Sequence, residues 1–87
     1  MATLNRLRRF ANKMQLRDLI ARSQGEWFPL LASGCISSGE ERVFITAQYK
    51  RPSGDMYCGY VTRDNNDLKE IEYSDIVTVE GYVLVTS

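Results

Sequence analysis

A predicted β-hairpin over residues 43–63 constrains the fold more than any other stretch of the chain. Its first arm alternates in the manner of a half-buried strand, with one face formed by Val43, Ile45, Ala47 and Tyr49. Phe44 breaks the alternation, so we expect something to cover that face as well. Pro52 and Gly54 then suit a tight turn, because proline fixes φ and glycine tolerates a positive φ. Strand-forming sequence resumes at Met56, and we expect the sheet over residues 43–85 to organise the rest of the chain.

Length and composition favour one small domain. The 87 residues are 44% hydrophobic and 25% charged, which is ordinary for a globular protein. A chain this short buries a limited part of its surface, so association with a partner or a second copy is a common remedy. No apolar run approaches a membrane span, and the N-terminus lacks the apolar core of a signal peptide. We expect a cytoplasmic single domain over residues 1–87, with a basic helical segment at 1–24 and a β-sheet body at 40–86.

The residue types that usually carry catalysis or bind metals are scarce. No histidine occurs in the chain, which removes the commonest general base and metal ligand. The acidic turn at residues 64–67 lacks the glycine and glutamate of a calcium loop, and no glycine-rich phosphate loop precedes a helix. Cys35 and Cys58 are predicted to be free thiols, with a disulfide between them as the alternative. We therefore predict no metal, no cofactor and no enzymatic activity.

The neutral net charge hides a division between a basic and an acidic part. Residues 1–24 contain six basic residues and one acidic residue, a net charge of +5, whereas residues 25–87 contain five and ten, a net charge of −5. On a helix, spacings of three and four would produce a basic ridge of Arg6, Arg9, Lys13 and Arg17. The second part is predicted to form an acidic face of Asp64, Asp67, Glu70, Glu72, Asp75 and Glu80. The ridge can follow phosphates, pair with an acidic protein surface, or be the ordinary solvated side of a helix.

The first segment, residues 3–23, is predicted to be helical. Apolar residues recur at spacings of three and four, namely Leu4, Leu7, Phe10, Ala11 and Met14. After Met14 the stripe changes phase, which permits either one helix ending at Gly25 or two short helices with a break between Asn12 and Gln15. The second apolar patch consists of Leu16, Leu19 and Ile20. It belongs either to the core of this chain or to a partner, and we predict a homodimer formed through these three residues.

The stretch before the hairpin is apolar but contains Pro29, which argues against a central strand. We expect a short edge strand or loop that lays Trp27 and Phe28 over the sheet. Trp27 is interpreted as a core or lid aromatic rather than as a ligand-stacking residue. Beyond the hairpin, strands are expected over 68–73 and 76–85, with a bulge or bend at Gly81.

The order of these elements resembles the layout of small SH3-like or Sm-like β-barrels that follow an N-terminal helix. The resemblance covers residues 40–85 and rests on no motif. The predicted fold class is α+β, with an N-terminal helix or two short helices followed by a small, mostly antiparallel sheet or SH3/Sm-like β-barrel of about five strands. The predicted function is that of a small non-catalytic regulatory or adaptor protein acting by protein–protein contact, such as a viral or bacterial inhibitor or accessory factor. The alternative is a nucleic-acid-binding module that uses the basic helix, and no membrane partner is expected.

Overall fold

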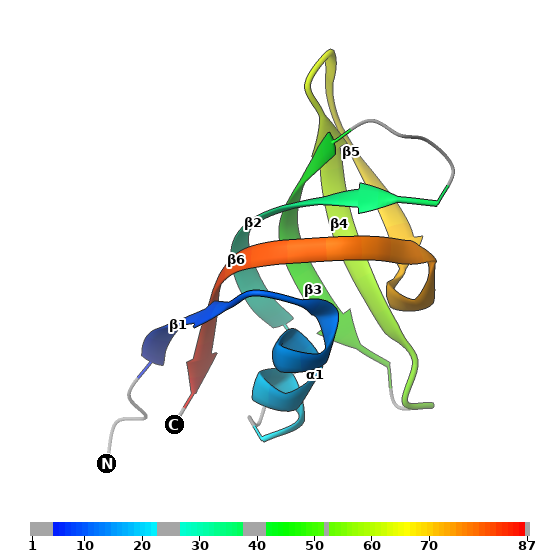
Figure 1. Ribbon diagram of the computed structural model, residues 1–87. Helices are drawn as coiled ribbons and strands as arrows, with labels where there is room; N and C mark the ends of the chain where they lie inside the picture. Colours follow the sequence, from blue (N-terminus) through cyan, green and yellow to red (C-terminus); the bar gives the residue numbers. More distant parts are fainter. Residues whose placement is uncertain (1–4, 23–26, 38–41, 52, 87) are drawn as a thin grey trace.

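The computed structural model describes residues 5–22, 27–37, 42–51 and 53–86 (Figure 1). Within these residues the strands are β1 (Asn5–Phe10), β2 (Trp27–Ile36), β3 (Arg42–Lys50), β4 (Met56–Thr62), β5 (Asn65–Glu72) and β6 (Ile76–Thr86). Helix α1 (Lys13–Ala21) follows β1, and a single 3-10 turn, η1 (Tyr73–Asp75), precedes β6. The predicted contributions of Leu4, Gly25 and Pro52 lie outside the described residues.

Antiparallel pairing joins the strands into one sheet in the order β1-β6-β2-β3-β4-β5. The predicted α+β fold, with an N-terminal helix leading into a sheet or SH3/Sm-like barrel of about five strands, is therefore wrong. Residues 5–10 form a strand that pairs with β6 from Asn5 opposite Thr86 to Phe10 opposite Gly81. The apolar residues of this segment recur at helical spacing, which is a weak local preference for a helix. Pairing of all six residues with β6 outweighs that preference.

Helix α1 begins where Asn12 caps it. The Oδ1 atom of Asn12 accepts a hydrogen bond from the backbone N–H of Gln15 at 2.9 Å. In return, Oε1 of Gln15 accepts one from the backbone N–H of Ala11 at 2.7 Å. This reciprocal arrangement satisfies free donors at the start of a helix. Neither predicted alternative, one helix or two helices with a break between Asn12 and Gln15, is correct, because a strand ends at Phe10 and the helix already begins at Lys13.

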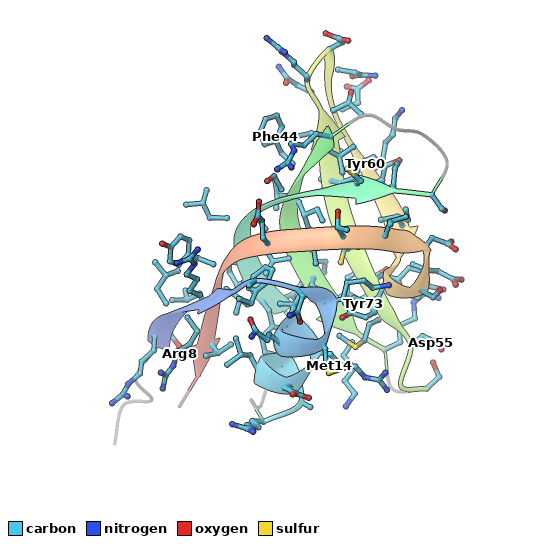
Figure 2. The ribbon with its side chains drawn as sticks, in the orientation of Figure 1. Arg8, Met14, Phe44, Asp55, Tyr60 and Tyr73 are labelled. Carbon is cyan, nitrogen blue, oxygen red and sulfur yellow. The ribbon has the colours of Figure 1, made fainter. Side chains whose placement is uncertain are left out.

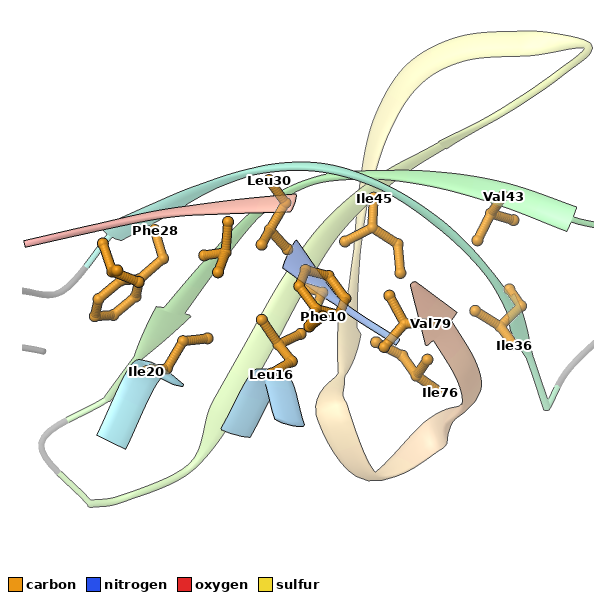
Figure 3. Packing of buried hydrophobic residues seen from close by; sticks show 13 residues of the cluster. Phe10, Leu16, Ile20, Phe28, Leu30, Ile36, Val43, Ile45, Ile76 and Val79 are labelled. Atoms are coloured by element: carbon orange, nitrogen blue, oxygen red, sulfur yellow. The ribbon is translucent and has the colours of Figure 1, made fainter. Parts of the chain in front are cut away.

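The hydrophobic core lies between the sheet and α1. Figure 3 shows side chains of β2, β3 and β6 directed toward Phe10, Leu16 and Ile20. These three side chains are 1%, 0% and 2% exposed, and Leu19 is partly buried against them. The patch of Leu16, Leu19 and Ile20 thus covers the chain's own core. The predicted homodimer through these residues is wrong for the folded chain, because a sheet that curls around one short helix can cover the whole patch.

The predicted hairpin is confirmed as β3 and β4. The turn between them is closed by a hydrogen bond from the Arg51 N–H to the Asp55 carbonyl at 2.8 Å, and Gly54 has the expected positive φ of 93°. The alternation of β3 changes at an extra residue, Thr46, where the register with β4 shifts. Beyond it Gln48 faces the core, fully buried, and its Oε1 accepts a hydrogen bond from the Cys58 thiol at 3.3 Å. Tyr49 consequently faces outward instead of inward.

β2 is a central strand despite Pro29. Its pairing with β6 begins only at Leu30, so at Pro29 the strand pairs with β3 alone. The missing N–H of proline is tolerated where a strand has one neighbour, and the register of β2 with β3 also shifts just after this point. The prediction of an edge strand or loop is therefore wrong for β2 as a whole, although Pro29 itself occupies an edge-like position.

Gly81 marks the place where β6 passes close to β2. Its φ is 148°, and a Cβ added there would lie 2.4 Å from the carbonyl oxygen of Leu31. Figure 1 shows β6 changing direction along its length, from pairing with β2 to pairing with β1. The expected bend is confirmed at this glycine, whereas the register of β6 with β2 shifts earlier, next to Ile76.

Tyr73 connects η1 to the beginning of α1 (Figure 2). Its hydroxyl donates a hydrogen bond to the backbone carbonyl of Lys13, and the Lys13 Nζ lies 4.8 Å from the centre of its ring. Burial raises the pKa of Tyr73 to about 12. The turn that precedes β6 is thereby attached to the helix that covers the core.

We expect Tyr73→Phe to lower the free energy of unfolding by about 1 kcal/mol, because the Lys13 carbonyl loses its partner. Since the folded pKa lies above the unfolded value of about 10, this contribution is fully present below that pH and is lost as the pH rises toward 12. Denaturant titrations at neutral and alkaline pH measure both effects. The wild type should lose more stability on alkalinisation than Tyr73→Phe does. Equal losses would contradict the assigned role of the hydroxyl, since other titrating groups are common to both proteins.

Candidate protein-interaction surface

Three aromatic side chains stand in a row across the outward side of β2, β3 and β4. Trp27 is opposite Tyr49, and Tyr49 is opposite Tyr57, so the pleat directs all three to the same side. The ring centres of Trp27 and Tyr49 are 4.8 Å apart, and those of Tyr49 and Tyr57 are 5.6 Å apart with an interplanar angle of 15°. Trp27 remains 64% exposed at the open end of the row. Its interpretation as a core or lid aromatic is therefore wrong.

Arg51 and two carboxylates close the other end of the row. The guanidinium carbon lies 3.9 Å from the centre of the Tyr57 ring, and Nη2 is 3.3 Å from Oε1 of Glu70. The Tyr57 hydroxyl donates a hydrogen bond to Glu72 at 3.2 Å. A hydrogen bond with Tyr49 is the largest cause that raises the pKa of Arg51, while burial and the bond to Glu72 raise the pKa of Tyr57. These contacts hold the Tyr57 ring against Arg51 and its hydroxyl against Glu72.

Apolar side chains continue the same side of the sheet toward β1. Leu31 lies opposite Tyr82 on β6, and Leu84 of β6 lies opposite Leu7 on β1. Leu31 is 74% exposed, Leu7 60% and Tyr82 41%. We call the surface formed by Leu7, Trp27, Leu31, Tyr49, Tyr57 and Tyr82 the outer face. Isolated exposed apolar residues are common, but a set spread over neighbouring strands of one sheet is typical of a contact surface.

Phe44 extends the apolar character toward the other end of β3. It is 48% exposed and pairs with Ser33 on one side and Val61 on the other (Figure 2). We expected something to cover Phe44. The side chain is instead half open to solvent.

The structure divides the predicted basic ridge between two elements. Arg6 and Arg9 lie on β1, whereas Lys13 and Arg17 lie on α1. The Lys13 ammonium rests over the Tyr73 ring, and Arg17 lines a surface hollow together with Asp55 and Glu72. The four residues do not form one helix face, because the helix begins only at Lys13.

The predicted acidic residues are also distributed over several elements. Asp67, Glu70 and Glu72 lie on β5, Asp64 lies in the turn before it, and Asp75 lies in η1. Glu80 is on β6, where Arg42 lies 3.7 Å away. Of the three on β5, Glu72 accepts a hydrogen bond from Tyr57 in the aromatic row, and Glu70 pairs with Arg51 beside it.

The Cys58 thiol is buried next to Gln48. Burial raises the pKa of Cys58 to about 12, so its thiol stays protonated at neutral pH and is a poor nucleophile. Cys35 and Cys58 are both free, as predicted.

Within residues 5–22, 27–37, 42–51 and 53–86, no group of three or more Cys, Asp or Glu side chains is arranged to hold a metal ion. Across the same ranges, no helix has the length and apolar character needed to cross a membrane.

Comparisons with protein-family models, curated proteins and solved structures found no match for this chain.

From the sequence, Tyr49 and Tyr57 can offer stacking surfaces only if they are exposed, and Trp27 was not expected to join them. Strict alternation in the hairpin predicts that Tyr49 lies on the buried side with Val43 and Ile45. The residue types do not predict the extra residue at Thr46, which reverses this alternation. One signal was present. The short turn between Arg51 and Asp55 places Lys50 opposite Met56 and therefore Tyr49 opposite Tyr57.

Proposed function

We propose that this protein is a small non-catalytic adaptor or regulatory module that binds a protein partner through the outer face. The observation that carries the proposal is the exposed Trp27 at the end of a row of contacting rings, on the same side of the sheet as the exposed Leu31 and Tyr82. Aromatic residues and arginine dominate the binding energy of protein interfaces, above all when their conformation is fixed beforehand. The two free thiols are consistent with action in a reducing compartment such as the cytoplasm.

The charges around the row favour a protein over a nucleic acid. Nucleic-acid stacking platforms combine rings with unpaired basic groups that meet the phosphates. Here the nearest basic group, Arg51, is paired with Glu70, and Glu72 adds a second carboxylate next to Tyr57. Negative charge at this position repels a phosphate backbone. The basic-helix alternative also loses its single helix face, because Arg6 and Arg9 lie on a strand.

Site-specific photo-crosslinking tests this proposal. We expect a photoreactive phenylalanine analogue in place of Trp27 to form covalent adducts with another protein in cells, and these adducts should survive nuclease treatment. The matched control carries the analogue at Met14, which is 74% exposed but lies on α1 away from the outer face. Adducts that disappear with nuclease would support the nucleic-acid alternative. Equal yields at both positions, or none at residue 27, would overturn the proposed surface.

A further inference from the structure

The two edges of the sheet carry opposite charges. β1 and β5 stand at the ends of the strand order, and each pairs with a single neighbour among the described residues. β1 contains three basic residues and no acidic one, a net charge of +3, in Arg6, Arg8 and Arg9. β5 contains three acidic residues and one basic one, a net charge of −2, in Asp67, Lys69, Glu70 and Glu72.

Both edges are accessible over most of their length. Residues 5–9 of β1 and 65–70 of β5 are exposed at every position, on both sides of their strands. Figure 1 shows the β4–β5 hairpin extending away from the core, and Figure 2 shows Arg8 directed away from the sheet. Each edge also presents one exposed leucine, Leu7 at 60% and Leu68 at 68%. Neither strand contains proline or glycine, so the outer backbone of each is suited to pairing.

Charged residues on an edge strand often serve to prevent pairing between copies. Charges of the same sign on both edges would block every such pairing. Here the signs differ, so β1 against β1 and β5 against β5 repel, while β1 against β5 attracts. Pairing of β1 with β5 is therefore the one favourable combination of these two edges.

We propose that β1 of one copy pairs with β5 of a second copy and continues the sheet across the two chains. The same two edges remain free at the ends of such a pair, because the contact joins different surfaces of the two copies. Interfaces of this kind produce rings or open chains rather than closed two-fold dimers. The inference uses the edges and does not depend on the partner proposed for the outer face.

A charge-exchange experiment in analytical ultracentrifugation tests the pairing. The β1 variant carries Arg6→Glu and Arg8→Glu, and the β5 variant carries Asp67→Lys and Glu70→Lys. Wild type at low ionic strength should reach at least twice the 10.0 kDa mass of one chain and should dissociate at high salt, where the Debye length falls to about 3 Å. Each variant alone should be monomeric, since both of its edges then carry one sign. Mixing the two variants in equal amounts should restore association.

The control variant carries Arg17→Glu and Arg22→Glu, which change the net charge as the β1 variant does but lie on α1 or just after it. It should associate like the wild type, and circular dichroism confirms that every variant is folded. A wild type that stays monomeric at millimolar concentration and low salt overturns the proposal. Association of either edge variant alone, or a mixture that stays monomeric, overturns it as well, because the interface would then involve other surfaces.

Discussion

Gly34→Ala is expected to destabilise the protein by about 3 kcal/mol, at the upper end of the range for overpacked sites. A Cβ at position 34 would lie 2.1 Å from the carbonyl oxygen of Thr78 and 3.1 Å from the Cα of Val79. Both atoms belong to the backbone of β6, so no side-chain rotation can relieve the contact. The strand would have to move away from β2, which carries the buried Ile36 and Leu30 of the core. Thermal and denaturant unfolding measure the loss.

Gly59→Ala provides the matched control for Gly34→Ala. A Cβ at Gly59 would meet the Cδ1 atom of Leu68 at 3.3 Å, and Leu68 is an exposed side chain that can rotate away. We expect the free energy of unfolding of Gly59→Ala to remain within about 0.5 kcal/mol of the wild-type value. If Gly34→Ala were as stable as Gly59→Ala, the close packing of β2 on β6 would be contradicted.

The hairpin was predictable because its information is local. Alternation over a few residues and the glycine that takes φ of 93° are sufficient to place β3, the turn and β4. The turn η1 before β6, which contains Ser74 and Asp75, and the bend at Gly81 occur at similarly local turn-forming residues. The same kind of reasoning failed for β1. Leu7 and Phe10 fit a helix as well as a strand, and the choice depends on the open edge of β6, more than 70 residues away along the chain.

The sequence contains a pattern that marks the start of α1, but a longer apolar stripe favoured a different start. Asn12 followed three residues later by Gln15 is a helix-start pattern, and it places the helix at Lys13. The longer apolar stripe through Met14 favoured a start near residue 3 instead. A helix that begins at the cap has a single apolar patch, so it would not have led to the prediction of a homodimer through Leu16, Leu19 and Ile20.

The outer face could not be predicted because it depends on register shifts between strands. The extra residue at Thr46 turns Tyr49 outward, and the shift between Pro29 and Ala32 adjusts β2 against β3. Such irregularities depend on how both neighbouring strands pack, which no single segment encodes. The edge charges, in contrast, were visible as a basic beginning and an acidic later part of the chain, although their positions on opposite edges required the strand order.

Leu16→Asp is expected to unfold the protein, because it places a carboxylate at a position that is 0% exposed in the middle of the core. A buried charge without a partner costs several kcal/mol, in addition to about 2–5 kcal/mol for the lost leucine, and the free energy of unfolding of small domains is only about 5–15 kcal/mol in total.

Met14→Asp is the control on the same helix. Met14 is 74% exposed near the N-terminus of α1, where a negative charge is favourable, so its stability should change by less than about 0.5 kcal/mol. Circular dichroism and denaturant unfolding compare the two variants. A folded Leu16→Asp protein that merely changed its state of association would contradict the buried position of Leu16 and would restore the helix as an interface.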